Sequence, residues 1–206
     1  MRSAGQRGFT LIEVLVALAL MAIVSVISWR GLDSVIRVRN HVERDAGHDD
    51  ALLRVLGQLE TDVQMRAPDA VIEGGGAAAR PAGTAGALPP ALRLDGQGGA
   101  LQLDIVRGPA FAGNWQRVRW WRDGNVLRRA PAPAGDTFPL PEPSPQDGAA
   151  VLDGVAGFSM QAWIPGQGWT PLPAPPSSPP ATGLAFVVQA GDPGAAQSYR
   201  RVVALP

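Results

Sequence analysis

The sequence contains no cysteine and no lysine, and it has only two histidines among its 206 residues. Without cysteine the chain forms no disulfide, holds no thiolate metal site and has no cysteine nucleophile. Without lysine it lacks the side chain that a phosphate-binding P-loop and a Schiff-base enzyme both require. We therefore expect a protein that is not an enzyme, with no catalytic residues and no cofactor.

The sequence also has no excess of charge of either sign, because its 18 basic residues balance its 18 acidic residues. A balanced chain has no broad positive field to attract nucleic acid, and we expect no nucleic-acid partner. Glycine (25) and proline (20) are abundant, but 46 per cent of the residues are apolar. This composition favours a folded core with long Gly/Pro-rich loops over a disordered chain.

No metal site is expected either. His41 and His48 are seven residues apart, whereas two ligands on one helix usually lie three or four residues apart, and no third ligand accompanies them. Asp45, Asp49 and Asp50 lack the loop pattern and the bidentate glutamate of a calcium site.

One long apolar run dominates the N-terminus. Residues 9–29 read FTLIEVLVALALMAIVSVISW and include a single charge, Glu13. Twenty-one helical residues rise about 32 Å, which is enough to cross the hydrocarbon core of a bilayer. A cleaved secretory signal peptide is the alternative, and Arg2 and Arg7 would supply its basic start. The sequence after Trp29 is a poor signal-peptidase site, so we expect a retained transmembrane helix.

Two side chains in this run call for separate explanations. Trp29 ends the run and is expected to anchor the helix at the membrane interface. Glu13 is costly within a bilayer, by about 3 kcal/mol at the centre and less near an end. Snorkelling to the interface is one explanation, and a functional partner for the carboxylate is the other.

The residues around Glu13 carry a motif, RGFTLIEV at positions 7–14. This motif resembles the class III signal of type IV pilins and type II secretion pseudopilins. The resemblance implies that a prepilin peptidase cuts between Gly8 and Phe9 and methylates the new amine of Phe9. Glycine before the cut would let the backbone enter a narrow active site. The resemblance also implies that Glu13 meets the terminal amine of a neighbouring subunit during assembly.

The leader also implies an orientation, with the N-terminus in the cytoplasm, the helix in the inner membrane and the remainder in the periplasm. The positive-inside rule alone would predict the reverse, because four arginines follow the anchor, at positions 30, 37, 39 and 44. Cleavage would remove two arginines and no acid, so 16 basic residues would face 18 acidic residues.

We expect four segments along the chain. A leader at 1–8 precedes a membrane helix at 9–29, which continues as a helical spine over residues 30–67. A β-rich head follows over residues 68–206. Apolar residues spaced three and four apart predict one buried stripe on the spine, and Pro68 predicts its end. Alternating residues predict short strands at 101–106, 117–122, 126–129, 158–164, 184–189 and 199–205. The predicted class is α+β.

Side-chain directions follow from the same alternation. Trp120 should face the core with Val118, while Trp121 and Trp163 should lie on outward faces, either as partner contacts or as packing beneath a loop. The arginines between 117 and 129 are expected to form a solvated sheet face. The Gly/Pro-rich stretches at 74–86, 130–148 and 171–180 are expected to be surface loops.

Several blocks of the spine and the head resemble the J-class minor pseudopilins of type II secretion. They are RGLD at 30–33, LETD at 59–62, DIVR at 104–107, VLDGV at 151–155 and the closing RRVVALP. The resemblance implies a long helix packed on a head of two antiparallel sheets. It implies a place at the pseudopilus tip beside the I-class and K-class subunits, with the H-class and major pseudopilins as further candidate partners. It also implies a role in exporting folded proteins across the outer membrane.

Two other functions compete with this interpretation. A minor type IV pilin would use the same leader for adhesion, motility or DNA uptake, but many such pilins carry a C-terminal disulfide that this chain cannot form. A membrane-tethered periplasmic enzyme would need a nucleophile and a base in the head, where only carboxylates are offered.

Overall fold

The computed structural model describes residues 11–74, 86–97, 100–108, 114–175, 177–191 and 196–205. Within these ranges the description leaves out the side chains of residues 33–38, 40–46, 73, 74, 97 and 100. The chain divides into two compact units, Met1–Asp50 and Ala51–Pro206.

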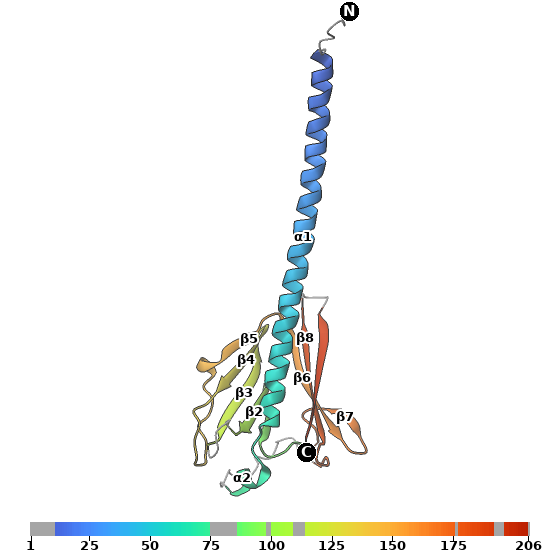
Figure 1. Ribbon diagram of the computed structural model, residues 1–206. Helices are drawn as coiled ribbons and strands as arrows, with labels where there is room; N and C mark the ends of the chain where they lie inside the picture. The colour runs from blue at the N-terminus through green and yellow to red at the C-terminus, as the bar shows by residue number, and fades with distance from the viewer. Residues whose placement is uncertain are drawn as a thin grey trace, which may run out of the picture. The chain divides into compact units, whose positions relative to one another are not determined.

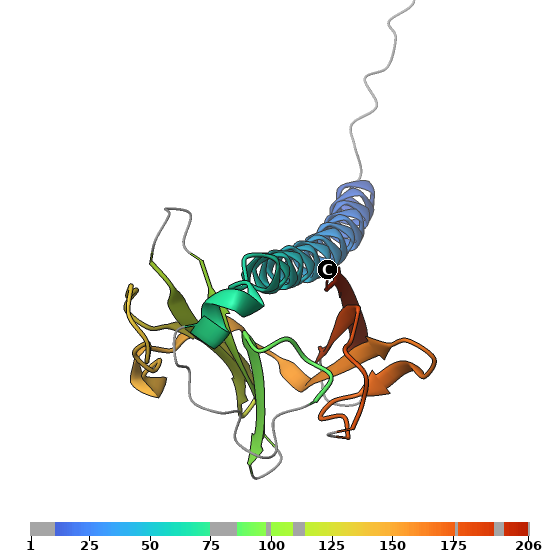
Figure 2. The ribbon, with the colours of Figure 1, turned by 90° about the horizontal axis from the view of Figure 1, so that it is seen from below.

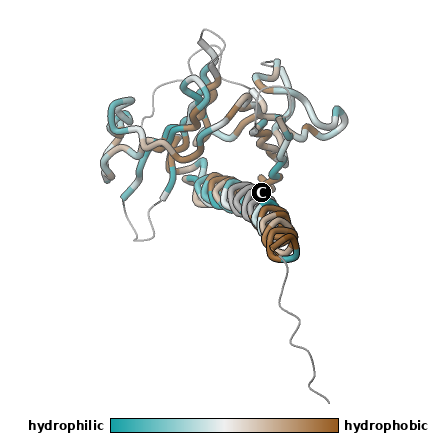
Figure 3. Tube along the Cα trace, turned by 90° about the horizontal axis from the view of Figure 1, so that it is seen from above, coloured by the Kyte–Doolittle hydropathy of each residue, from teal (hydrophilic) through white to brown (hydrophobic). Residues whose placement is uncertain are grey.

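The first unit consists of the N-terminal part of helix α1 (Leu11–Gln64). Its segment Leu11–Leu32 is long and apolar enough to span a membrane, since 22 residues rise about 33 Å. None of this segment is buried against the rest of the protein. Figure 3 shows this part of the helix mostly in the brown of hydrophobic residues. These properties fit the membrane anchoring of a prepilin-like protein.

The second unit contains two antiparallel sheets (Figure 1). The five-stranded sheet has the order β1-β2-β3-β4-β5, so each strand pairs with the next one in the chain. Its strands are β1 (Leu92–Gln97), β2 (Ala100–Arg107), β3 (Gln116–Asp123), β4 (Val126–Pro131) and β5 (Ala149–Leu152). Gly124, at a φ of 59°, turns the chain between β3 and β4 in a conformation that glycine adopts without strain.

The four-stranded sheet has the order β7-β6-β8-β9. Its strands are β6 (Val155–Ile164), β7 (Gly168–Pro171), β8 (Gly183–Ala190) and β9 (Gln197–Ala204). A short helix α2 (Asp69–Gly74) follows α1, and a 3₁₀ turn (Pro145–Asp147) precedes β5. Viewed from below, the two sheets lean apart, and the C-terminal part of α1 lies at the opening between them (Figure 2).

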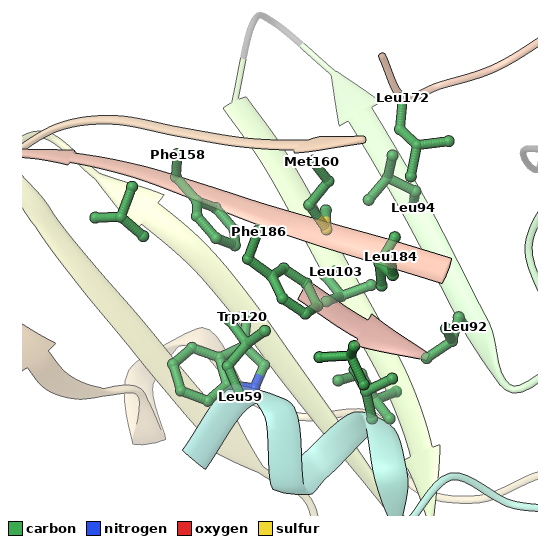
Figure 4. Close-up of a cluster of buried hydrophobic side chains, with 14 of the residues drawn as sticks. Leu59, Leu92, Leu94, Leu103, Trp120, Phe158, Met160, Leu172, Leu184 and Phe186 are labelled. Atoms are coloured by element: carbon green, nitrogen blue, oxygen red, sulfur yellow. The ribbon is translucent and has the colours of Figure 1, made fainter. Parts of the chain in front are cut away.

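The core is the space that the two sheets and residues 51–64 of α1 enclose. The helix contributes one stripe, in which the apolar members are Leu52, Val55, Leu56, Leu59 and Val63. Spacings of three and four residues place these side chains on one face. Figure 4 shows side chains from the helix and from both sheets pointing toward one another, with Trp120, Phe158 and Phe186 the largest. Each fully buried side chain of this size stabilises the fold by roughly 1.5–3 kcal/mol.

The predicted class is confirmed: the structure is an α+β fold with a long apolar helix followed by two antiparallel sheets. All six predicted strands are present, but β1, β5, β7 and α2 were not predicted. Helix α1 ends at Gln64, three residues before the expected boundary at 67. Leu53, an apolar residue of the spine, lies outside the buried stripe and is 63% exposed, because it is turned about 100° away from Leu52.

The interpretation of two Gly/Pro-rich stretches as surface loops is wrong in part. Leu172 and Ala174 of the stretch 171–180 belong to the main core, and Leu172 donates its backbone N–H to Met160 O at 3.0 Å. Ala132 and Leu140 of the stretch 130–148 are also buried. Proline has no backbone N–H to donate, but the residues between prolines can still bury their side chains. A proline-rich segment can therefore contribute apolar side chains to the core. Most of the stretch 74–86 lies outside the described residues.

Candidate functional site

The predicted cleavage and methylation site, Gly8 and Phe9, lies outside the described residues. Glu13 lies in the first turn of α1, where a carboxylate is stabilised by the positive end of the helix dipole. Its side chain is exposed, and so are the apolar side chains around it, including Leu11 and Ile12. Glu13 is therefore an accessible acid in an otherwise apolar helix surface, which suits contact with a cation from another chain.

Trp29 lies three residues before the end of the apolar segment that could span a membrane, and it is 79% exposed. An indole at this position has an apolar body for the acyl chains and an N–H for the headgroups. Its assignment as the interface anchor therefore stays a prediction with suitable geometry.

The head contains a charged centre that the sequence did not reveal. Asp62, on the buried stripe of α1, is fully buried. Arg129 Nε and Arg107 Nη1 donate to its two carboxylate oxygens at 2.8 and 2.6 Å. Trp120 Nε1 and Gln58 Nε2 also donate to it, each at 2.9 Å. The carboxylate thus receives bonds from β2, β3, β4 and its own helix.

This arrangement ties the helix to the five-stranded sheet. A second bond from Arg129, Nη2 to Oδ1 at 3.1 Å, makes that pair bidentate, and its guanidinium lies 5.7 Å from the ring centre of Trp120. Arg107 also donates to Gln116, whose amide in turn donates to Ala132 O at 2.8 Å. Buried charges are tolerated when they are paired and hydrogen-bonded in this way. The arrangement positions the end of the spine on the head, and it contains no reacting group.

The prediction of a solvated arginine face at 117–129 is wrong. Arg129 points into the head beside Trp120, its cross-strand neighbour. On the opposite face of the sheet, Arg119 makes two bonds to Asp104, at 2.7 and 2.8 Å, and Arg117 pairs with Glu142. The bonds to Asp104 raise the pKa of Arg119, which is already charged at every working pH. These three arginines form ion pairs. The sequence pattern alone did not distinguish paired arginines from solvated arginines.

The tryptophans largely follow their predicted directions. Trp120 and Val118 are fully buried, as predicted. Trp121 lies on the outer face but beneath the turn before β5. Its ring packs so closely against Gly148 that a Cβ at that position would come within 2.2 Å of it. Packing beneath a loop is therefore correct for Trp121. Trp163 is 42% exposed and outward-facing.

Within the described part of the chain, no group of three or more His, Cys, Asp or Glu side chains is placed to hold a metal ion. The side chains of His41 and Asp45 lie outside the description, while His48 is half-buried.

Two family models match the chain. The prokaryotic N-terminal methylation motif matches residues 3–29, which include Gly8, Phe9 and Glu13. The model of type II secretion system protein J matches residues 30–192, which cover the remainder of α1 and most of both sheets. The two matches adjoin between Trp29 and Arg30, and together they account for the apolar helix and the head.

Proposed function

The chain belongs to the type II secretion system protein J family, the minor pseudopilins of that machine, and we propose that it works at the tip of the pseudopilus. In this proposal it forms a tip complex with the I-class and K-class minor pseudopilins, with the H-class and major pseudopilins as further partners. The complex initiates or caps the filament and supports export of folded proteins across the outer membrane. The chain acts as a structural subunit and not as an enzyme.

One observation carries the proposal: a single helix bears an exposed apolar segment, Leu11–Leu32, and ends inside a folded head. An exposed apolar surface of this length needs lipid or other helices to cover it. In the membrane, lipid covers it; in a filament, the equivalent helices of neighbouring subunits do so. The buried bonds of Asp62 fix the head on the last turns of the same helix.

We propose the following maturation. The precursor sits in the inner membrane with its N-terminus in the cytoplasm and its head in the periplasm. Prepilin peptidase cuts between Gly8 and Phe9 and methylates Phe9. Trp29 stays near the periplasmic interface, and Glu13 pairs with the terminal amine of an adjacent subunit, so that neither charge is left alone in an apolar filament core.

The substitution Glu13→Gln tests this function in cells. Leader cleavage and membrane insertion should persist, because Gln removes the cost of a charge in the bilayer. Export should fall by at least about tenfold, the equivalent of about 1.4 kcal/mol, since the neighbour's amine loses its carboxylate. The readout is the amount of a folded substrate in the medium of a gene-deletion strain carrying each variant.

The exposed head carboxylate Asp153 supplies the control, and Asp153→Asn should restore export as the wild-type gene does. Full export by Glu13→Gln would contradict the proposed role of Glu13. Export that persists in the gene-deletion strain itself, together with loss of surface pili, would favour the minor type IV pilin instead.

A further inference from the structure

One face of the head exposes apolar side chains that the fold leaves uncovered. Among the described residues from 51 onward, the exposed large apolar side chains are Leu53, Trp163 and Val202. Trp163 and Val202 share the outer face of the four-stranded sheet, where Trp163 lies opposite Gly183 and Val202 lies opposite Ala185. Two of the three exposed side chains thus each lie opposite a small residue of β8, Gly183 for Trp163 and Ala185 for Val202.

This face is packed in a defined way. Trp169 of β7 meets Trp163 of β6 edge to face, with ring centres 5.4 Å apart and planes at 64°. Gly183 makes room for the pair, because a Cβ there would lie 3.3 Å from Trp163 Cβ and 3.6 Å from Trp169 Cη2. The two rings therefore rest close to the backbone of β8.

Arg200 of β9 completes the face. Its guanidinium carbon lies 4.3 Å from the ring centre of Trp169, and Nη2 donates to Gln161 Oε1 at 3.4 Å. Ala185 lies between β6 and β9 on this face and is fully buried. A guanidinium held over an aromatic ring loses less conformational freedom when it binds a partner.

Within the described part of the chain, no carboxylate bonds to Arg200. Six other arginines of the two sheets each have a carboxylate partner: Arg107, Arg117, Arg119, Arg128, Arg129 and Arg201. The outer face therefore offers one uncompensated cation, flanked by two indole rings and the aliphatic side chain of Val202. Tryptophan and arginine are the residue types that most often dominate binding energy at protein interfaces.

We propose that this outer face, defined by Trp163, Trp169, Arg200 and Val202, docks the head of a neighbouring pseudopilin subunit. The partner presents a carboxylate to Arg200 and an apolar side chain to the exposed side chains of Trp163 and Val202. This inference rests on the proposed function and names the surface that the tip complex uses.

The chemistry favours this occupant over others. A single cation does not suit nucleic acid or an anionic membrane surface, each of which binds clusters of basic residues. A face whose arginine and rings are already held in place suits one constant partner better than a succession of different exported proteins.

A cysteine-labelling experiment tests the contact directly, because the natural chain has no cysteine and a new thiol is the only reactive one. Full-length Val202→Cys and Asp95→Cys variants are labelled with a maleimide in detergent, alone and with the purified I-class and K-class pseudopilins of the same organism. Asp95 is the matched control, since it is exposed on β1 of the other sheet. We expect the Val202→Cys thiol to react at least about tenfold more slowly in the complex, and the Asp95→Cys thiol to react equally in both states.

An affinity measurement accompanies the labelling. Arg200→Glu should weaken the complex by at least about tenfold, whereas Arg122→Glu, on the other sheet, should leave it unchanged. A complex that forms with the Val202→Cys thiol fully reactive and with Arg200→Glu as tight as wild type overturns the docking surface and leaves the proposed function standing. Failure of the wild-type chain to form any complex overturns both. Protection that appears without partners and rises with the concentration of the chain overturns the proposal in favour of a second copy.

Discussion

Asp62→Ala is expected to destabilise the head by about 3–5 kcal/mol, the cost of removing one partner from a buried ion pair. The substitution leaves Arg107, Arg129 and the indole N–H of Trp120 without their shared acceptor. Domains of this kind are stable by only about 5–15 kcal/mol, so the loss removes a large part of the total. With an m-value of roughly 2 kcal/mol/M, the urea midpoint should fall by about 2 M.

The measurement is urea unfolding of the full-length chain in mild detergent, followed by tryptophan fluorescence. Asp123→Ala is the matched control: its carboxylate also pairs with an arginine, Arg128, but its side chain is 63% exposed. A surface pair of this kind contributes at most about 1 kcal/mol. Equal midpoints for the two variants would mean that the Asp62 cluster does not hold the helix on the sheet.

Gly8→Val is expected to abolish removal of the leader. A β-branched side chain next to the scissile bond restricts the backbone and occupies space that only glycine leaves open. We expect cleavage to fall by at least about 100-fold, which corresponds to about 2.7 kcal/mol in the barrier. The mass of the intact membrane-extracted chain reports the result: residues 1–8 should be absent from the wild type and present in the variant.

Ala4→Val, a change of the same kind inside the leader, should be cleaved normally. The wild-type chain should keep its leader in cells that lack prepilin peptidase. A Gly8→Val chain of mature mass, or a wild-type mass that does not depend on the peptidase, would show that Gly8 and Phe9 do not form the processing site.

The elements that were predicted from the sequence are those in which local pattern and tertiary environment agree. Strand β3 alternates between polar and apolar residues from Arg117 to Trp120, so Val118 and Trp120 were correctly placed in the core. The apolar run before Trp29 is long enough to span a bilayer, so its length and composition identify it without reference to the rest of the fold. The N-terminal motif is contiguous, so no fold is needed to recognise it.

The features that escaped prediction depend on contacts between distant residues. Strand β7 has only four residues, and it forms because β6 offers it an edge. In the sequence, Asp62 resembles any exposed acidic residue of a helix. Its partners Arg107 and Arg129 lie 45 and 67 residues further along the chain, and only the fold brings them beside it. One signal was present: Asp62 occupies a position in the apolar stripe between Leu59 and Val63, where a solvated acid is not expected.

The most direct test of the tip assignment is co-purification of the processed full-length chain with the I-class and K-class minor pseudopilins of its organism. All three are expressed together with prepilin peptidase, and only this chain carries an affinity tag. The account predicts a stable complex that contains both partners and survives size-exclusion chromatography. Recovery of the chain without either partner, but with a type IV pilus subunit when one is supplied, would contradict it.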